Sequence, residues 1–361
     1  MSATDIKEIL KKKDLEKNDL IKLLSLKEED SKALFNKALE VKLKNVGNSI
    51  HLRGLIEYSN ICEKNCLYCG LRKNNPDKNL YTLSDEQIDS CICQAIELRY
   101  GSVALQCGER CSEEFTLKVT QIIKRIKELS DGKIGITLSC GEQSEKTYKK
   151  WFEAGAHRYL LRIETSNKEL YYKIHPKDEK HSFVNRINCL SSLKKIGYQV
   201  GTGIMVGLPF QTYEDIANDI LFFKQEDVAM VGLGPFIPHK DTPLWKFKNN
   251  IPNNEERMFL TLKTLAIVRI MMPKINMVSA TANQTLDPLG REKAVVVGAN
   301  VIMPNLTPTT NRKDYSIYPN KACVDDSPKD CANCLEIRMK TINHTILYDR
   351  WGDSPAFLEK Q

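Results

Sequence analysis

The sequence lacks the two kinds of apolar segment that direct proteins into or across membranes. Its longest apolar run lies around Val295 to Met303 and is well short of the roughly 18 residues that a membrane-spanning helix requires. The N-terminus, Met1 to Asp5, leads into lysine-rich sequence and contains no apolar core of a secretory signal. We therefore expect no membrane span and a cytoplasmic location.

The sequence also lacks the features of a nucleic-acid-binding protein. Its net charge of +7 comes mostly from lysines spread along predicted helices, such as Lys11 to Lys17 and Lys42 to Lys44. No motif interleaves aromatic with basic side chains in the way that RNA-binding modules do. We interpret the excess charge as solvated surface and predict no nucleic-acid partner.

Nothing in the composition indicates extensive disorder, because 42% of the residues are hydrophobic and 27% are charged. At 361 residues the chain exceeds the usual single-core domain of about 100 to 200 residues, but it fits one α/β barrel with extensions. We therefore expect one large domain.

Cysteine, by contrast, is abundant, with 12 residues in the chain. In a reducing compartment this number does not indicate a disulfide framework, and two tight groups of three favour metal ligation. We interpret the other six as small residues of the core. These scattered cysteines are Cys91, Cys93, Cys107, Cys111, Cys140 and Cys189.

The order of apolar patterns predicts an α/β fold. Residues 5 to 46 carry apolar positions at helical spacing, which predicts an N-terminal helical cap. From residue 52 onward, short apolar runs alternate with amphipathic helices, as in βα units with a parallel sheet. The eight predicted strands are Gly54 to Tyr58, Val103 to Gln106, Ile134 to Ser139, Tyr159 to Glu164, Gly201 to Val206, Met230 to Leu233, Met277 to Thr281 and Asn300 to Met303.

Eight such units predict a TIM-type (β/α)8 barrel. We place the helical cap at residues 1–50, the barrel at 51–310 and a C-terminal extension at 311–361. Helix boundaries are marked by a capping box at Ser84 with Gln87 and by glycines at Gly101, Gly155 and Gly197. Polar and glycine-rich segments follow the predicted strands, and in this fold the C-terminal mouth holds the chemistry.

The first of these segments contains three thiols, Cys62, Cys66 and Cys69, at gaps of four and three. A loop this short can direct all three at one iron-sulfur cubane. Three thiolates on a [4Fe-4S] cluster leave one iron open to a ligand, and an open iron implies chemistry. The alternative is a zinc knuckle, which requires paired Cys-x-x-Cys motifs or a fourth Cys or His in the loop, and neither is present.

This spacing after the first barrel strand resembles the signature of the radical S-adenosylmethionine (SAM) superfamily. Glu164 after the fourth strand and Gly207-Leu208-Pro209 after the fifth match positions at which that superfamily contacts SAM. The resemblance implies that SAM binds the open iron and that one electron from the reduced cluster splits it into methionine and a 5′-deoxyadenosyl radical. The barrel would then orient the reactants and exclude water.

Longer stretches resemble one family within it, HydE, the [FeFe]-hydrogenase maturases. The resemblance covers about residues 50 to 335 and is more specific than the cysteine loop. Its matching stretches are Arg53 to Asn60, Tyr68 to Arg72, Tyr159 to Thr165, Met205 to Pro209, Gly232 to His239 and Gly298 to Asn305.

The resemblance to HydE implies a set of site residues. Arg162, Glu164, Arg186 and Met230 fall where the family holds SAM. An Arg and a Glu at one mouth can pair with the carboxylate and the ammonium of SAM, although an internal ion pair would explain both residues as well. Ser139 is expected among the cofactor-binding and cavity residues. The other positions matching the substrate cavity are Gln106, Thr281, Met303, Tyr315 and Tyr318.

Two positions depart from the family's pattern. Cys107 stands where the family often has serine, and Ala280-Thr281 stands where it has paired threonines. The Cys107 thiol either packs in the core or faces the cavity, and the sequence leaves both alternatives open.

A second group of thiols, Cys323, Cys331 and Cys334, matches an auxiliary iron-sulfur site of some HydE proteins. The resemblance implies a second [2Fe-2S] or [4Fe-4S] cluster there, or a site that stays empty. Because the segment is polar, we expect it to be exposed at the surface and remote from the radical chemistry.

The leading functional hypothesis is a radical SAM enzyme that helps assemble the diiron site of [FeFe]-hydrogenase. The resemblance implies a substrate of iron-bound cysteine carrying carbon monoxide and cyanide, and partners among the other hydrogenase maturation proteins. One alternative is 3-methylornithine synthase, a lysine mutase of pyrrolysine biosynthesis. Another is a noncatalytic iron-sulfur carrier, which would have no need of a SAM pocket.

Overall fold

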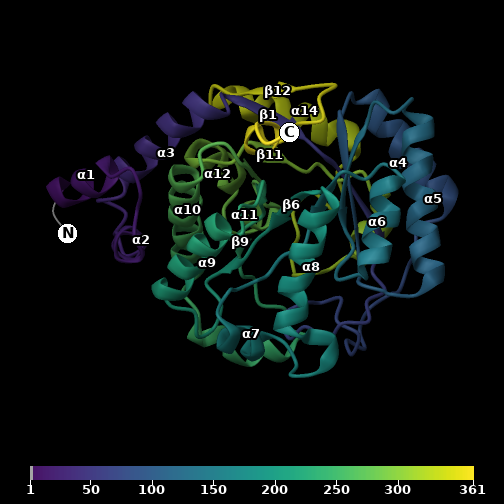
Figure 1. Ribbon diagram of the computed structural model, residues 1–361, viewed down its shortest axis with the longest axis horizontal. Helices are drawn as coiled ribbons and strands as arrows, with labels where there is room; N and C mark the ends of the chain where they lie inside the picture. Colours follow the sequence, from purple (N-terminus) through teal and green to yellow (C-terminus); the bar gives the residue numbers. More distant parts are fainter. Residues whose placement is uncertain (1–2) are drawn as a thin grey trace.

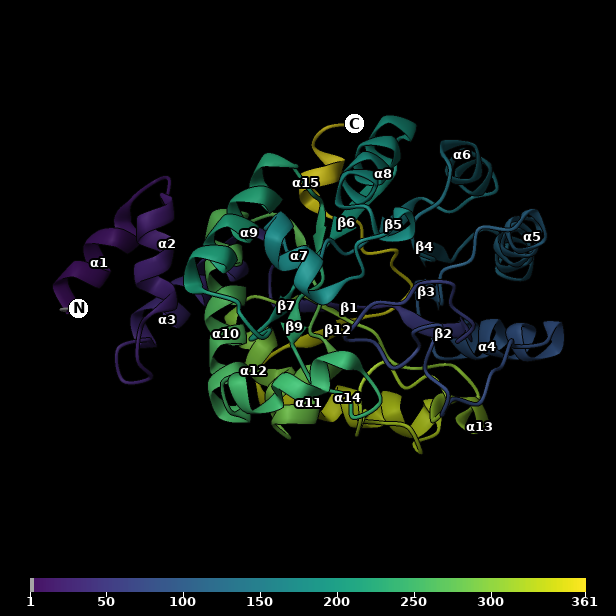
Figure 2. The same ribbon diagram turned by 90° about the horizontal axis from the view of Figure 1, so that it is seen from below.

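The computed structural model describes residues 3–361, and its central element is a sheet of seven parallel strands in the order β10-β8-β6-β5-β4-β3-β2 (Figures 1 and 2). Neighbours in the sheet follow one another in sequence, as expected when each strand is followed by a helix that returns the chain to the same end. These strands are β2 (Gly54–Ser59), β3 (Ser102–Cys107), β4 (Gly135–Ser139), β5 (Arg158–Leu160), β6 (Gln199–Thr202), β8 (Met230–Val231) and β10 (Asn276–Met277).

An eighth strand, β11 (Val301–Ile302), lies between β10 and β2. A parallel bridge between Val278 and Val301 joins it to β10. On its other side, the N–H of Leu55 donates to the carbonyl of Pro304, and the N–H of Leu306 donates to the carbonyl of Leu55. The predicted α/β barrel and its eight strand regions are therefore confirmed, but the eighth strand is attached by single bridges and not by a regular ladder.

Helices cover the outer face of this sheet (Figure 2). Strand residues that point outward, such as Ile56 and Ile136, are fully buried beneath them. The covering helices are α4 (Asp85–Glu97), α5 (Glu113–Leu129), α6 (Glu145–Glu153), α8 (Phe183–Ile196), α9 (Tyr213–Gln225), α10 (Asn254–Met271) and α12 (Gly290–Val297). Shorter elements at the mouth are β7 (Met205–Val206) with β9 (Gly234–Pro235), α7 (Lys168–Ile174), α11 (Thr281–Leu286), α13 (Thr309–Arg312), and the 3-10 segments at Glu179–His181 and Pro243–Asn250.

The sequence signals for helix ends are mostly confirmed. Ser84 and Gln87 form the expected capping box at the start of α4. Gly197 ends α8 with a left-handed φ of 107°, which residues with a Cβ rarely adopt. Gly101 has another role, because α4 already ends at Glu97 and a Cβ on Gly101 would lie 2.2 Å from the backbone of Arg350.

The predicted N-terminal helices are confirmed as α1 (Ala3–Lys11), α2 (Lys17–Leu24) and α3 (Lys32–Asn45). They lie to one side of the barrel, where α3 packs against α10 and α12 and α2 packs against α9 (Figure 1). Leu20, Leu23, Leu24 and Leu34 are fully buried there. Burial of each such side chain contributes roughly 1.5 to 3 kcal/mol, so the cap is held mainly by its apolar face.

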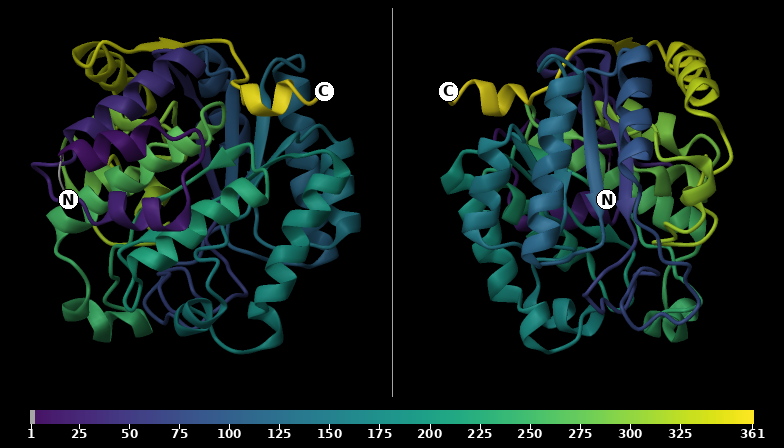
Figure 3. Two further views of the ribbon diagram at one scale, coloured as in Figure 1. Left: turned by 60° about the vertical axis from the view of Figure 1, so that its left-hand side comes forward. Right: turned by 90° about the vertical axis from the view of Figure 1, so that its right-hand side faces the viewer.

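The C-terminal segment packs against the side of the barrel and then crosses the end opposite the mouth (Figure 3). It consists of α14 (Pro328–Thr341), β12 (Thr345–Leu347), which pairs with β1 (Ser49–Leu52), and α15 (Pro355–Leu358). Between β12 and α15, Asp353 accepts hydrogen bonds from Arg158 and Gln199, and the carbonyl of Gly352 accepts one from Arg53. These partners stand at the starts of β5, β6 and β2, so the segment plugs the barrel floor.

Among residues 3–361, no helix has the length and apolar character needed to cross a membrane. The division at residues 50 and 310 stays a prediction. β1 spans the first boundary, and its pairing with β12 joins the cap side of the barrel to the C-terminal extension.

Candidate SAM and iron-sulfur site

The three cysteines of the first group lie in the loop between β2 and α4, at the mouth of the barrel. The base of this loop is fixed by Asn60, whose side chain donates to the carbonyls of Asn79 (2.6 Å) and Asp314 (2.8 Å). Gly108, after β3, lies so close to the loop that a Cβ there would be 2.3 Å from the carbonyl oxygen of Ile61. The fold therefore brings the residues after β3 directly against the cysteine loop.

All three thiols are only partly exposed. Burial is the main cause that raises the pKa of Cys62 and of Cys66, and it raises the pKa of Cys69 to about 12. Cys62 Sγ accepts a hydrogen bond from the N–H of Glu109 at 3.3 Å. Thiols of this kind become thiolates when a metal replaces the proton, as iron-sulfur ligation requires.

In the described part of the chain, no three His, Cys, Asp or Glu side chains converge as the ligands of a single metal ion would. This arrangement does not argue against a cluster, because each thiolate of a cubane binds a different iron. A cluster therefore needs ligands spaced around its corners and not directed at one point.

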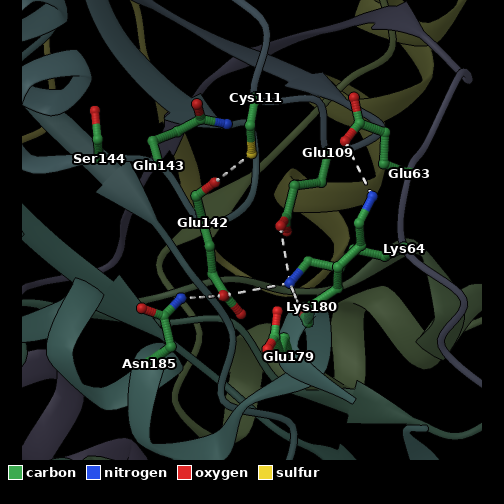
Figure 4. A pocket seen from close by; sticks show the side chains of 10 residues that line it. All are labelled: Glu63, Lys64, Glu109, Cys111, Glu142, Gln143, Ser144, Glu179, Lys180 and Asn185. Carbon is green, nitrogen blue, oxygen red and sulfur yellow. Dashed lines mark hydrogen bonds and ion pairs between the residues drawn. The ribbon is translucent and has the colours of Figure 1, made fainter.

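Beside the loop, four buried charges form an ion-pair network that we call the mouth tetrad: Lys64, Glu109, Glu142 and Arg186. Lys64 Nζ lies 3.0 Å from Glu109 Oε1 and 3.3 Å from Glu142 Oε2 (Figure 4), and Arg186 Nε lies 2.5 Å from Glu142 Oε1. The two cations and two carboxylates balance each other, and each of the four side chains is at most 10% exposed. The tetrad connects the cysteine loop with the segments after β3 and β4 and with α8.

The electrostatics of the tetrad follow from these contacts. Burial disfavours the charge of Lys64, but its two carboxylate partners outweigh burial and raise the pKa of the ammonium. Burial also acts against the charge of Glu142, yet Arg186 and Lys64 lower the pKa of that carboxyl. Both groups therefore carry their charges at neutral pH.

Arg162 and Glu164, predicted to hold SAM, lie together after β5. Arg162 Nη2 donates to Glu164 Oε2 at 2.9 Å and to the carbonyl of Ile204 at 2.7 Å. Glu164 has a left-handed φ of 66°, a strained conformation for a residue other than glycine. Burial raises the pKa of its carboxyl, and Arg162 and Arg186 oppose that effect.

Arg186 reaches the same place from α8 and donates to the carbonyl of Arg162 at 3.1 Å. The Nε of Arg162 is buried without a hydrogen-bond acceptor, whereas the Nε of Arg186 pairs with Oε1 of Glu142 at 2.5 Å. The mouth thus holds two guanidinium groups and the carboxylate of Glu164, a set that fits the carboxylate and ammonium ends of an amino acid.

Comparison with known proteins identifies this arrangement. The family model for the Radical SAM superfamily matches residues 56–223. The chain is 42% identical to the [FeFe] hydrogenase maturase subunit HydE of Thermotoga maritima, and the match covers 99% of both chains. The chain belongs to the HydE family of radical SAM enzymes. Membership implies a [4Fe-4S] cluster and SAM as cofactors. The three thiols fit the cluster, and the charged groups of Arg162, Arg186 and Glu164 fit SAM.

Other relatives are more distant. The chain is 29% identical to 3-methylornithine synthase of Methanosarcina acetivorans over 80% of this chain and 79% of that protein. Among solved structures, methylornithine synthase (PylB) superposes with a TM-score of 0.80 at 24% identity, covering 96% of this chain and 98% of that one. HydG, a maturase of the [FeFe]-hydrogenase, also reaches 0.80 at 20% identity, covering 96% and 77%. At these identities the two structures show the fold alone.

Two of the predicted cavity residues of this HydE-family chain lie in one row across the sheet. The register pairs Glu57 of β2 with Gln106 of β3, and Gln106 with Ser139 of β4. Gln106 and Ser139 keep partial exposure among buried neighbours. They therefore stand beside each other near the C-terminal edge of the sheet.

The remaining cavity residues come from segments after β10 and β11. Thr281 and Met303 line one small cavity. Thr281 begins α11 and does not end a strand as predicted, since β10 already ends at Met277. Tyr315 is buried beneath Lys321, whose Nζ lies 5.3 Å from the ring centroid, and Tyr318 is partly buried.

Met230 is not brought to the mouth. It begins β8, and its sulfur accepts a hydrogen bond from Arg53 at 3.0 Å. Arg53 also donates to the carbonyl of Gly352 in the floor plug. The thioether therefore lies deep in the barrel, at the level of the floor.

Cys107 packs in the core beside Cys140, and burial raises the pKa of its thiol. Cys91 and Cys189 are also buried, as expected of core cysteines, whereas Cys93 and Cys111 are exposed.

The second cysteine group is less exposed than its polar sequence predicted. Cys331 is buried, Cys323 is partly buried, and only Cys334 is exposed. Cys323 and Cys331 line the same small cavity as Thr281 and Met303. The expectation of surface exposure was wrong for Cys331, because α14 packs its inner face, including Leu335 and Met339, onto the core. That the group lies remote from the radical chemistry stays a prediction.

The mouth tetrad was not predicted from the sequence. Glu109 and Glu142 each follow a predicted strand, which was a signal for the mouth, and Lys64 stands between two cysteines of the loop. Their pairing could not be inferred, because it depends on how three loops meet in space.

Proposed function

We propose that this chain takes part in building the diiron active site of [FeFe]-hydrogenase. The observation that carries the proposal is the 42% identity to a HydE maturase over 99% of both chains. The proposed substrate is an iron-bound cysteine carrying carbon monoxide and cyanide. Other hydrogenase maturation proteins would be its partners, and the cytoplasm its location.

In this proposal Cys62, Cys66 and Cys69 ligate the [4Fe-4S] cluster, and Arg162, Glu164 and Arg186 hold SAM. The cluster and SAM supply a 5′-deoxyadenosyl radical when both are bound and one electron is provided. The protein's own contribution is orientation. Arg162 offers a carboxylate its buried Nε, which has no acceptor, Arg186 adds a second positive charge beside it, and Glu164 offers an acceptor to an ammonium.

The substrate is proposed to contact Gln106, Ser139, Thr281, Met303, Tyr315 and Tyr318, of which Thr281 and Met303 line a common cavity. Met230 is left out of the SAM contacts because its sulfur is engaged by Arg53 at the barrel floor. The buried tyrosines and the floor plug keep water from the interior, which protects a radical from side reactions.

Cys323, Cys331 and Cys334 are proposed to bind a second [2Fe-2S] or [4Fe-4S] cluster. Cys323 and Cys331 line a common cavity, and the exposed Cys334 lies one turn further along α14 from Cys331. One buried, one partly buried and one exposed thiol suit a cluster at the edge of the fold.

The second candidate function is 3-methylornithine synthase, favoured by 29% sequence identity over 80% of the chain. A noncatalytic iron-sulfur carrier is a weaker candidate. It would gain nothing from gathering Arg162, Glu164 and Arg186 at one place, since the buried Nε of Arg162 without an acceptor costs free energy.

The test is a hydrogenase maturation mixture that lacks HydE. Adding the reconstituted protein with SAM and reductant is expected to restore hydrogenase activity, and Cys66→Ala protein is expected to restore none. If the wild-type protein gives no activity but converts lysine to 3-methylornithine, the second candidate replaces the first.

A further inference from the structure

Asp219, on α9, is a fully buried carboxyl group in contact with the turn that follows β5. Its Oδ1 accepts a hydrogen bond from the backbone N–H of Ser166 at 2.5 Å and another from the Ser166 hydroxyl at 2.6 Å. The hydroxyl of Thr165 makes a third, longer contact at 3.5 Å. One oxygen of Asp219 therefore holds the two residues that directly follow Glu164.

A second carboxylate of α9 holds the next residue of the same turn. Asp215 lies one helical turn before Asp219, and its Oδ1 accepts a hydrogen bond from the Asn167 side chain at 2.7 Å. The side-chain oxygen of Asn167 in turn caps α7, because it accepts from the N–H groups of Glu169 and Leu170. Helix α9 thus fixes the whole connection between β5 and α7.

Glu164 is the residue that needs this support. Its left-handed φ of 66° costs free energy in a residue with a Cβ, and such a conformation persists only when the surrounding structure fixes it. On one side, the N–H of Glu164 donates to the carbonyl of Gly203 at 3.0 Å. On the other side, Asp219 holds Thr165 and Ser166. Without the second set of contacts, the backbone of Glu164 would be free to relax.

The hydrogen bonds to this turn are the contacts that the Asp219 carboxyl makes. Its Oδ2 is buried without a hydrogen-bond partner, and no basic side chain of residues 3–361 forms an ion pair with it. Burial is the main cause that raises the pKa of the carboxyl to about 7, so its neutral and charged forms are both present near neutral pH. Oδ1 accepts hydrogen bonds in both forms, so the role of the group is to accept and not to carry charge.

We propose that Asp219 is a positioning residue for SAM, which keeps Glu164 in its binding conformation by way of Thr165 and Ser166. The proposal rests on the proposed function, in which Glu164 offers its carboxylate to the ammonium of SAM. If the turn relaxes, that carboxylate moves away from the ammonium and SAM binds less tightly. Asp219 itself acts through the turn and does not touch the cofactor.

The experiment measures the dissociation constant of SAM for the reconstituted holoenzyme, with the cluster content determined on the same samples. Asp219→Leu keeps most of the volume of the side chain but accepts no hydrogen bond, so it is expected to weaken SAM binding by at least about tenfold. Asp219→Asn keeps an acceptor at Oδ1 and is expected to bind SAM within about threefold of the wild type. Because both variants remove the charge, rescue by asparagine identifies the hydrogen bonds as the cause.

Ser166→Ala tests the same contact in a milder way. It removes the hydroxyl that donates to Asp219 but keeps the backbone N–H, so the expected loss of SAM affinity is about fivefold, as for one hydrogen bond. This variant decides the question if Asp219→Leu does not fold.

Asp19→Leu is the matched control. Asp19, on α2, is also a buried carboxyl that accepts a hydrogen bond from a backbone N–H, that of Glu16 at 3.1 Å, but it lies in the N-terminal cap. Its loss is expected to lower the free energy of unfolding and to leave the SAM affinity unchanged. The comparison separates a specific effect on the mouth from a general loss of stability.

Three outcomes overturn the proposal. The first is wild-type SAM affinity in folded Asp219→Leu or, if that variant does not fold, in Ser166→Ala. The second is an equal loss of affinity in Asp219→Leu and Asp219→Asn, which would make the charge the cause. The third is a loss of cluster in Asp219→Leu equal to that in Cys66→Ala, which would place the effect in the cysteine loop.

These titrations need neither hydrogenase nor the other maturation proteins. Their failure is therefore distinct from a failure of the maturation assay, which tests the proposed function with the wild-type protein.

Discussion

The guanidinium Nε of Arg186 lies 2.5 Å from Oε1 of Glu142, in an ion pair buried at the mouth of the barrel. Glu142 also pairs with Lys64, which stands between two cysteines of the loop after β2. One carboxylate therefore connects a predicted SAM residue with the predicted cluster loop. We predict that Glu142 is a positioning residue, because it holds Arg186, which is predicted to bind SAM.

Glu142→Gln is expected to weaken SAM binding by at least about tenfold, because the loss of a charged partner lets the Arg186 side chain leave its position. The measurement is the dissociation constant of SAM, with the cluster content determined on the same sample. Glu145→Gln, which removes an exposed partner of Lys195 in the next helix, is the control and is expected to bind SAM normally. Equal SAM affinity in the wild type and Glu142→Gln at full cluster content would contradict the positioning role.

Cys66→Ala is expected to abolish the reductive cleavage of SAM to 5′-deoxyadenosine, whereas Cys331→Ala is expected to retain it. Cys66→Ala would leave the cluster with only two thiolate ligands. Cys331 belongs to the second group, on α14, so its loss leaves the ligands of the first cluster intact. The measurement is 5′-deoxyadenosine formed by anaerobically reconstituted protein with reductant. Cys93→Ala, with an exposed thiol outside both groups, is the control. Cleavage by Cys66→Ala would mean that the cluster has been assigned to the wrong ligands.

Asp353→Asn is expected to lower the free energy of unfolding by about 3 to 5 kcal/mol, because it leaves the buried guanidinium of Arg158 without its carboxylate. Asp353 Oδ1 lies 2.5 Å from Arg158 and 3.0 Å from His157. Asp349→Asn, which removes an exposed pair with Arg99, is expected to cost less than about 1 kcal/mol. Urea unfolding followed by circular dichroism measures the free energy of unfolding of both variants. Similar losses in the two variants would contradict a stabilising role of Asp353 at the barrel floor.

The same floor is expected to make the protein sensitive to acid. Burial lowers the pKa of His157 and of His51 to about 4, and Arg158 adds to the effect for both. In the unfolded chain both histidines titrate near pH 6.5. Between about pH 6.5 and 4 the unfolded state therefore binds protons that the folded state does not bind. The free energy of unfolding is expected to fall over that range by roughly 3 kcal/mol for each histidine.

Urea unfolding at a series of pH values measures this dependence. His157→Gln removes one of the two titrating groups and is expected to flatten the curve below pH 6.5. If the free energy of unfolding of His157→Gln falls with pH as steeply as that of the wild type, His157 does not cause the sensitivity to acid.

Much of this protein could be read from the sequence by local rules. The apolar runs located all eight strand regions, and helical spacing located α1 to α3, since both depend on residues that are neighbours in the chain. The three-cysteine loop could also be identified from the sequence, because Cys62, Cys66 and Cys69 lie within eight residues. Family resemblance then added Arg162, Glu164 and Arg186, which the structure brings together at the mouth.

The tertiary structure alone decided which residues far apart in the sequence lie in contact and which are buried. Lys64, Glu109, Glu142 and Arg186 come from four segments, so no local pattern predicts that their charges balance. Met230 was expected at the cofactor, but its place at the start of β8 puts it near the floor. Cys331 was expected at the surface, but it lies on the buried face of α14. Burial and charge pairing are set by which loops and helices meet when the barrel closes, and only the folded chain contains that information.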